Sequence, residues 1–267
     1  MPHPDPCPLL RHPLQEPSAF TPERLMDDVR QSRGVAPGPV PDICILEFDG
    51  DLTDWLVREG KAAPCPQWAC FHTTMWEINL AGERCGIIAR TIGGPYAVLI
   101  AEQLHAAGVR FLAGLTSAGR ISPNLPLPCL VVADSAVRDE GTSYHYLAPE
   151  AEARCNAAVV RCLERELPAT GWPVHAGRVW TTDAPYRETP SQLQDHARHG
   201  VLAVEMQAAS LFAFGIARHA AVATVAVLSN ATDHDGSQFD TGTMHDGLRF
   251  LEAIARAGRA YLNGEHS

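Results

Sequence analysis

From residue 41 onward, short apolar runs alternate with longer amphipathic stretches. The runs have the length and apolar content of buried strands. The expected strands are 43–48, 76–80, 86–89, 110–115, 127–133, 174–180 and 221–228. The expected helices are 95–107, 151–167, 190–199, 205–219 and 243–262. Strands that alternate with helices predict a single α/β domain, in which helices flank a mostly parallel, mixed central sheet.

The first 40 residues follow a different pattern. Ten of the 21 prolines lie within the first 41 residues, and proline lacks the amide proton that a sheet interior requires. Thr21 is suited to cap a helix whose first residue is Pro22. We therefore expect residues 1–40 to form a proline-rich N-terminal arm with one short helix, and residues 41–267 to form the α/β domain.

Composition limits the partners of the chain. With 46% apolar and 19% charged residues, the chain has enough apolar side chains to form a sizeable buried core. Its net charge of −10 opposes general nucleic-acid binding. The longest nearly apolar run, 220–228, is about half the length of a membrane-spanning helix. No signal peptide or Cys-x-x-Cys pair is evident, which favours a cytoplasmic protein whose eight cysteines are reduced.

Four loops that follow expected strands carry chemically useful residues. Ligands of open α/β sheets bind at the carboxyl ends of the strands, where such loops lie. Glycines in the 90–95 loop would let a ligand approach a helix N-terminus, and hydroxyls in the 114–120 loop could bind a ligand oxygen. Both loops are equally compatible with ordinary tight turns. Their candidate ligand-binding residues are Gly94, Thr116 and Ser117.

The other two loops are richer in functional groups. The 181–189 loop combines an aromatic ring, a guanidinium group and a carboxylate, which can stack on and hydrogen-bond a planar heterocycle. In the simpler alternative, Glu188 starts a helix beside a solvated Arg187. The 204–210 loop opens an alanine-rich helix with polar residues, although a methionine there is more often core filler. The candidates from these loops are Tyr186, Arg187, Glu188, Glu205, Met206 and Gln207.

In this order and spacing, the loops resemble those of the nucleoside phosphorylase superfamily, specifically its uridine phosphorylase-like and hexameric purine nucleoside phosphorylase branch. The strongest markers are 92–95, 138–146, 182–186 and 204–209, and the resemblance spans roughly residues 41–262. It implies an enzyme that cleaves the N-glycosidic bond between a base and ribose through an oxocarbenium-like state. It also implies a small-molecule nucleoside substrate, no cofactor or metal, inorganic phosphate as a possible co-substrate, and a homo-oligomer, either a dimer or a hexamer.

The resemblance implies roles for individual residues on the sugar side. Met206 matches a methionine that packs against the sugar. Gln207 takes the place of a glutamate that usually hydrogen-bonds the ribose 2′- and 3′-hydroxyls. Thr116 and Ser117 match a hydroxyl-bearing loop near the phosphate and the ribose. His145 is a candidate contact to the sugar, and a purely structural histidine is the alternative.

On the base side, Pro185 and Tyr186 match the loop that covers the base. Asn230 matches the residue that supports leaving-group activation in purine-cleaving relatives, where it is commonly an aspartate. An asparagine can donate a hydrogen bond to a base carbonyl but cannot protonate the base. Asp233 is therefore the candidate general acid, provided that burial raises its pKa. The residues expected to read the base are Tyr186, Arg187, Glu188 and Asn230.

The sequence departs from the phosphorylase pattern where phosphate would bind. Phosphorylases of this branch use a Gly-Asp-Pro loop with an arginine, but the corresponding run, 48–54, has Asp54 at the arginine position. Ala113 and Gly114 occupy the stretch where a second arginine is expected, and the arginine that a neighbouring subunit would contribute, just before 73–76, is not apparent. A buried phosphate needs charge-assisted partners. The possible replacement anion clamp consists of Arg90, Arg120 and the Gly94 backbone.

We therefore expect hydrolysis in preference to phosphorolysis, with Thr116, Ser117 and either Glu205 or Asp183 positioning water. One alternative is a true uridine or purine nucleoside phosphorylase with a rebuilt phosphate site. Another is a catalytically inactive nucleoside-binding protein. A metal site at 233–235 and Asp240 is disfavoured because the run lacks the carboxylate spacing of a calcium loop, and a solvated loop is expected there.

Overall fold

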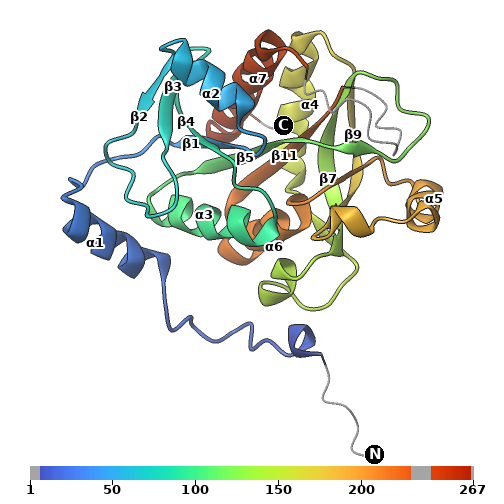
Figure 1. Cartoon of the computed structure of the whole chain (residues 1–267), viewed down its shortest axis with the longest axis horizontal. Coiled ribbons are helices and arrows are strands. Elements are labelled where there is room, and N and C mark those ends of the chain that lie inside the picture. Colours follow the sequence, from blue (N-terminus) through green and yellow to red (C-terminus); the bar gives the residue numbers. More distant parts are fainter. Residues whose placement is uncertain (1–6, 230–241, 266–267) are drawn as a thin grey trace, which may run out of the picture.

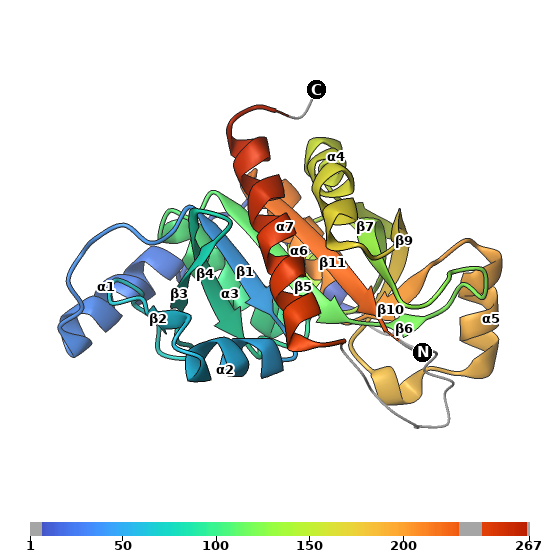
Figure 2. The ribbon, with the colours of Figure 1, turned by 90° about the horizontal axis from the view of Figure 1, so that it is seen from above.

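The computed structural model describes residues 7–229 and 242–265 (Figure 1). These residues build one mixed sheet of eleven strands in the order β2-β3-β4-β1-β5-β11-β7-β9-β10-β6, with β8 paired to β7. Helices α3 and α6 cover one face of the sheet, and α4 and α7 cover the other (Figures 1 and 2). The predicted single α/β domain with a mixed sheet is confirmed.

The elements have the following bounds. The strands are β1 (Ile43–Glu47), β2 (Ala62–Pro64), β3 (Trp76–Leu80), β4 (Glu83–Ala89), β5 (Phe111–Ser117), β6 (Gly119–Arg120), β7 (Cys129–Asp139), β8 (Glu152–Arg154), β9 (Val174–Thr182), β10 (Ala203–Glu205) and β11 (Ala221–Leu228). The α-helices are α1 (Pro22–Arg33), α2 (Asp51–Arg58), α3 (Gly94–Ala106), α4 (Ala157–Glu166), α5 (Pro190–Arg198), α6 (Ala208–Arg218) and α7 (Met244–Leu262). Four short 3-10 helices are η1 (Pro8–Leu10), η2 (Thr142–His145), η3 (Leu167–Thr170) and η4 (Pro185–Arg187).

The central strands β4, β1, β5 and β11 are parallel and buried on both faces. Ala113 of β5 pairs with Ile45 of β1 on one side and with Ala223 of β11 on the other. All eight residues of β11 are buried, which explains its uninterrupted apolar sequence. Because the four strands run in the same direction, their carboxyl ends meet at one edge of the sheet.

The remaining part of the sheet reaches that edge by a different route. β7 is antiparallel to β11, and β9 and β10 run in the same direction as β7. β6 begins only two residues after β5 ends, and it pairs with β10, so that Gly119 lies opposite Val204. This pairing folds the sheet back on itself and brings the end of β10 beside the end of β5 (Figure 2). The end of β10 therefore reaches the carboxyl ends of the central strands although the sheet as a whole is not parallel.

Two predicted helices begin later than expected. The 151–167 stretch starts as β8, whose Ala153 pairs with Ala136 of β7, and α4 begins only after Asn156, whose side chain accepts a hydrogen bond from Ala158 N. The 205–219 stretch starts with the last residue of β10, and α6 begins at Ala208. Long-range strand pairing decided both boundaries, which helical periodicity alone cannot reveal.

Two further helices lie outside the central pattern. Helix α2, which the sequence analysis did not predict, follows β1 directly and buries Leu52 and Leu56. Helix α1 packs on α3 and ends at Gly34, whose left-handed φ is +66°. Thr21 occupies the N-cap position of α1, as predicted, but its side chain accepts no hydrogen bond from the backbone of the helix. Within the described part of the chain, none of the helices is long and apolar enough to cross a membrane.

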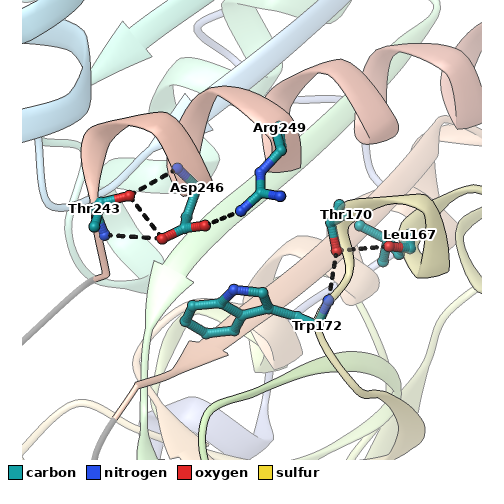
Figure 3. A network of polar contacts seen from close by, with 6 residues as sticks. All are labelled: Leu167, Thr170, Trp172, Thr243, Asp246 and Arg249. Atoms are coloured by element: carbon teal, nitrogen blue, oxygen red, sulfur yellow. Dashed lines mark hydrogen bonds and ion pairs between the residues drawn. The ribbon is translucent and has the colours of Figure 1, made fainter.

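Helix α7 has a well-defined start near the edge of the sheet at which the carboxyl ends of the central strands meet. Thr243 and Asp246 form a capping box, in which the Thr243 side chain accepts a hydrogen bond from Asp246 N while the Asp246 carboxylate accepts one from Thr243 N (Figure 3). Arg249 pairs with the same carboxylate. The ring of Trp172 packs edge-on against Phe250, with 5.0 Å between the ring centroids. These contacts fix the position at which the chain enters α7.

Candidate active site

The 204–209 segment, which we call the sugar turn, is organised by a buried carboxylate. Glu205 accepts hydrogen bonds from Gln207 N at 2.6 Å and Ala208 N at 2.8 Å, and its other oxygen accepts one from the Thr181 hydroxyl. The Thr181 hydroxyl in turn accepts from Ala209 N at 2.9 Å. One carboxylate thus joins the end of β9 to the first turn of α6.

Glu205 is only 4% exposed, and burial raises its pKa to about 7, against the lowering effect of the Thr181 hydroxyl and the backbone amides. All of its described contacts are internal to the fold. These contacts show that Glu205 positions the sugar turn, and the expectation that either Glu205 or Asp183 positions water stays a prediction.

The structure brings several predicted sugar-side residues together. The side-chain oxygen of Gln207 accepts a hydrogen bond from Met206 N at 3.2 Å and lies 3.5 Å from the Thr116 hydroxyl, which donates to the Ser117 carbonyl at 2.8 Å. Gln207 is buried, whereas Met206 and Ser117 are partly exposed. A cluster of hydroxyl, amide and thioether groups therefore lies where the end of β5 meets the sugar turn.

A second carboxylate lies next to this cluster. Asp49 accepts hydrogen bonds from the Ser117 hydroxyl at 2.8 Å and from Ser117 N at 3.0 Å, and burial raises its pKa. The sequence analysis did not select Asp49 as a site residue, although it lies in the run compared with the phosphate loop. A small cavity of about 30 Å³ adjoins it, lined in part by Asp51 and Gly242, and has room for one or two water molecules.

The 48–54 segment, which we call the acidic loop, is folded around Glu47. The buried carboxylate of Glu47 accepts hydrogen bonds from Gly50 N at 2.7 Å, Thr53 N at 3.1 Å and the Thr53 hydroxyl at 2.8 Å. Burial raises the pKa of Glu47, while these hydrogen bonds oppose the increase. The loop then presents Asp49, Asp51 and Asp54 around its turn.

The arginine nearest to the acidic loop is already paired. Arg90 donates two hydrogen bonds to Asp54, at 3.0 and 2.6 Å, and this pairing lowers the pKa of the Asp54 carboxyl. Arg90 has a left-handed φ of +61°. A Cβ atom at Gly50, where φ is +93°, would lie 2.6 Å from the Arg90 side chain. The glycine therefore lets the guanidinium group lie across the loop.

The other two members of the predicted anion clamp also have contacts within the fold. Arg120, on β6, donates to the Leu125 carbonyl at 3.4 Å. A Cβ atom at Gly94 would lie 2.1 Å from the Ser210 hydroxyl oxygen, so close packing of α3 on α6 accounts for this glycine. Each of the three residues thus has a contact within the fold, and their joint role in binding an anion stays a prediction.

The predicted base loop lies mostly in solvent. Tyr186 is 99% exposed, Arg187 is exposed, and Glu188 is half-buried with a pKa that burial raises. Asp183 accepts a hydrogen bond from Gly141 N at 2.9 Å, and its pKa is raised by burial. Sequence reasoning missed the buried aromatic beneath this loop: Trp180 donates to Asp139 at 3.0 Å and stacks on His196.

His145 lies against the N-terminal segment and not in the sugar cluster. Its ring lies against the ring of His12 in a tilted arrangement, with 3.7 Å between the centroids, and partial burial lowers its pKa, with His12 contributing. Asn230 and Asp233, as well as the run 233–235 with Asp240, lie outside the described residues. Within the residues that are described, the structure contains no group of three metal-ligating side chains placed to hold an ion.

Comparison with known proteins gives consistent matches. A family model described as "Phosphorylase superfamily" matches residues 42–260. A DeoD-type purine nucleoside phosphorylase from Jannaschia sp. is 28% identical over 211 residues, which cover 75% of this chain and 86% of that protein. A guanosine phosphorylase from Halorubrum lacusprofundi is 29% identical over 132 residues, 49% of this chain and 55% of that protein.

A solved structure is similar over most of its length. The crystal structure of uridine phosphorylase from Vibrio fischeri matches with a TM-score of 0.65 and 21% identity, covering 84% of this chain and 91% of that chain. At this level of identity the likeness shows a shared fold.

Proposed function

This chain belongs to the Phosphorylase superfamily, and from that premise we propose that it cleaves the N-glycosidic bond of a nucleoside or nucleoside-like small molecule and transfers the sugar to water. The names of similar proteins, a purine nucleoside phosphorylase and a guanosine phosphorylase, support a nucleoside substrate. The cluster of Thr116, Met206 and Gln207 supplies groups suited to a sugar.

The observation that carries the choice of water is the Arg90–Asp54 ion pair. Phosphate is an anion, and its removal from water must be offset by cations or hydrogen-bond donors. Here Arg90 is neutralised by Asp54, and the acidic loop adds Asp49 and Asp51 nearby. An anion at this place would meet net negative charge, whereas a water molecule would find hydrogen-bond acceptors.

In the proposed reaction, Gln207 and Thr116 hold the ribose hydroxyls and Met206 packs against the sugar. As the bond between C1′ and the base nitrogen breaks, its electron pair leaves with the base. Water attacks C1′ and gives a proton to Asp49, which Ser117 holds in place through two hydrogen bonds. The base gains a proton on departure. For this step Asn230 and Asp233 remain the proposed leaving-group residues, and Arg187 and Glu188 the proposed base-reading residues.

Phosphorolysis is the second candidate, because the relatives named above are phosphorylases. It would require a substrate-bound state in which Arg90 leaves Asp54.

We also infer that the protein is a cytoplasmic homo-oligomer, a dimer or hexamer, that uses no cofactor or metal and binds neither nucleic acid nor membrane. Measuring the mass of the purified chain by light scattering tests the oligomer.

Liquid chromatography of products from a panel of purine and pyrimidine nucleosides, with and without phosphate, tests the function. We expect free base and free ribose at equal rates in both conditions. Ribose 1-phosphate that forms only with phosphate would establish phosphorolysis and reject our choice of water. Nucleoside binding in a thermal-shift assay without any product would instead establish a binding protein.

A further inference from the structure

A second cavity lies at the opposite end of the sheet from the candidate active site. Its volume is about 500 Å³, and it is bounded by the end of α6, the beginning of β11 and the passage from β8 to α4. Helix α6 has eleven residues and runs from the sugar turn to this cavity, so the two sites are separated by about 16 Å of helix. None of the residues assigned to the reaction lines this cavity.

The floor of the cavity is apolar and aromatic. Phe212 and Val222 are 2% and 3% exposed, and Ile216, at 45%, is one of the exposed large apolar residues. The carbonyl oxygen of Val222 accepts a hydrogen bond from the Cys155 thiol at 3.3 Å, so this backbone group is not left unpaired. The volume and this lining are those of a pocket for a small organic molecule.

The rim of the cavity carries the exposed guanidinium group of Arg154, and the carboxylate of Asp134 lies close enough to Cys155 to contribute to the raised pKa of that thiol. Arg154 is 73% exposed and lies 3.4 Å from Glu152, but Glu152 also pairs with Arg178 at 3.0 Å. The single carboxylate of Glu152 therefore forms ion pairs with two guanidinium groups. The rim also includes Asn156, which caps α4, and no acidic side chain lies in the first turn of that helix. The positive end of the helix dipole thus adds to the charge of Arg154.

We propose that this cavity binds a small organic anion with a flat apolar body. The ring of the ligand would lie against Ile216, above the buried Phe212 and Val222, and its carboxylate or phosphate would meet Arg154 and the N-terminus of α4. An aryl carboxylate and a nucleoside monophosphate share this chemistry. Burial of the ring and a charge-assisted hydrogen bond together provide the affinity, so neither the ring nor the anion alone is enough.

Isothermal titration of the full chain with benzoate, uridine monophosphate, inorganic phosphate and the neutral analogue benzamide tests the proposal. We expect at least one ring-bearing anion to bind, and inorganic phosphate and benzamide to bind at least about tenfold more weakly. If neither benzoate nor uridine monophosphate binds at millimolar concentration, the proposal is wrong.

Two variants locate the binding. Arg154→Gln should weaken the binding of the ring-bearing anion about tenfold or more, while Arg198→Gln, which changes a similarly exposed arginine on α5, should leave it unchanged. Ile216→Asp, at an exposed position on the rim, should weaken it as well. Binding that survives Arg154→Gln but is lost in Gln207→Ala would belong to the candidate active site and would overturn the proposal. Because the readout is binding, the result does not depend on the proposed hydrolysis.

Discussion

The sugar turn and the acidic loop share one hydrogen-bonding arrangement around a buried glutamate, and they differ in the side chains that surround this glutamate. In each, a buried glutamate at the end of a strand accepts hydrogen bonds from two backbone amides and one threonine hydroxyl. In the sugar turn this residue is Glu205, and in the acidic loop it is Glu47. Around the first, the groups are neutral and polar except for the nearby Glu140 carboxylate, whereas three further carboxylates and one paired arginine surround the second.

In the proposed function, this difference corresponds to two tasks, binding the sugar and selecting the molecule that accepts it. The sugar turn can keep its geometry with a neutral Gln207, because hydrogen bonds to hydroxyls do not require charge. The acidic loop keeps its backbone through Glu47, yet the charges it presents decide whether an anion can approach. If the proposed hydrolysis is correct, a few side chains on one loop are enough to change the acceptor within this fold.

The largest expected effect concerns the acidic loop. Asp49→Asn keeps acceptor and donor atoms near Ser117 but cannot take a proton from water, so kcat should fall about 100- to 1,000-fold with little change in KM. Steady-state kinetics on the best nucleoside of the panel measures this, with Asp27→Asn on the exposed face of α1 as the control. A kcat within about twofold of the parent would remove Asp49 from the proton transfer.

In the sugar turn, Gln207→Ala removes the amide that faces Thr116. We expect kcat/KM for ribosides to fall about tenfold, since one or two hydrogen bonds to hydroxyls are lost. A 2′,3′-dideoxynucleoside should show no such loss. Equal losses for both substrates would mean that the variant has disturbed the turn and that Gln207 does not bind the hydroxyls.

Glu205 makes the sugar turn sensitive to pH. Its pKa rises from 4.5 to about 7 on folding, so the folded state binds more protons than the unfolded state between these values. The free energy of unfolding should therefore fall as the pH rises through this window, by up to about 1.4 kcal/mol per pH unit, and level off above it. Urea denaturation from pH 4.5 to 8 measures the slope.

Glu205→Gln should remove this contribution to the slope. Glu164→Gln, at an exposed position on α4, should leave it in place. Identical pH profiles for Glu205→Gln and the parent would show that Glu205 does not change its protonation on folding.

The smallest expected effect is that of breaking the ion pair on the acidic loop. Both partners are about half exposed, so Asp54→Asn should change stability by no more than about 1 kcal/mol. It also frees Arg90, so inorganic phosphate should bind the variant more tightly than the parent. Calorimetric titration with phosphate measures this, and unchanged phosphate binding would show that Asp54 is not what keeps the anion away.

Much of the fold could be predicted because burial leaves a local pattern. The central strands are buried on both faces and therefore appear as uninterrupted apolar runs, of which β11 is the clearest. α2 and the start of α4 could not be read in this way. α2 is short, and its position depends on Glu47, while the first residues of the 151–167 stretch became a strand because β7 offered a partner.

For the site, the sequence by itself predicted which loops carry hydroxyl, amide and carboxylate side chains, and the family resemblance indicated that Asp54 stands where an arginine is expected. Only the tertiary structure decided which of these groups meet. β6 pairing with β10 brings Gln207 to Thr116, and the chain reversal around Glu47 brings Asp49 to Ser117. The pairing of Arg90 with Asp54 joins residues 36 positions apart. Such contacts depend on how the sheet closes and how loops turn, and a one-dimensional pattern of residue types does not contain that geometry.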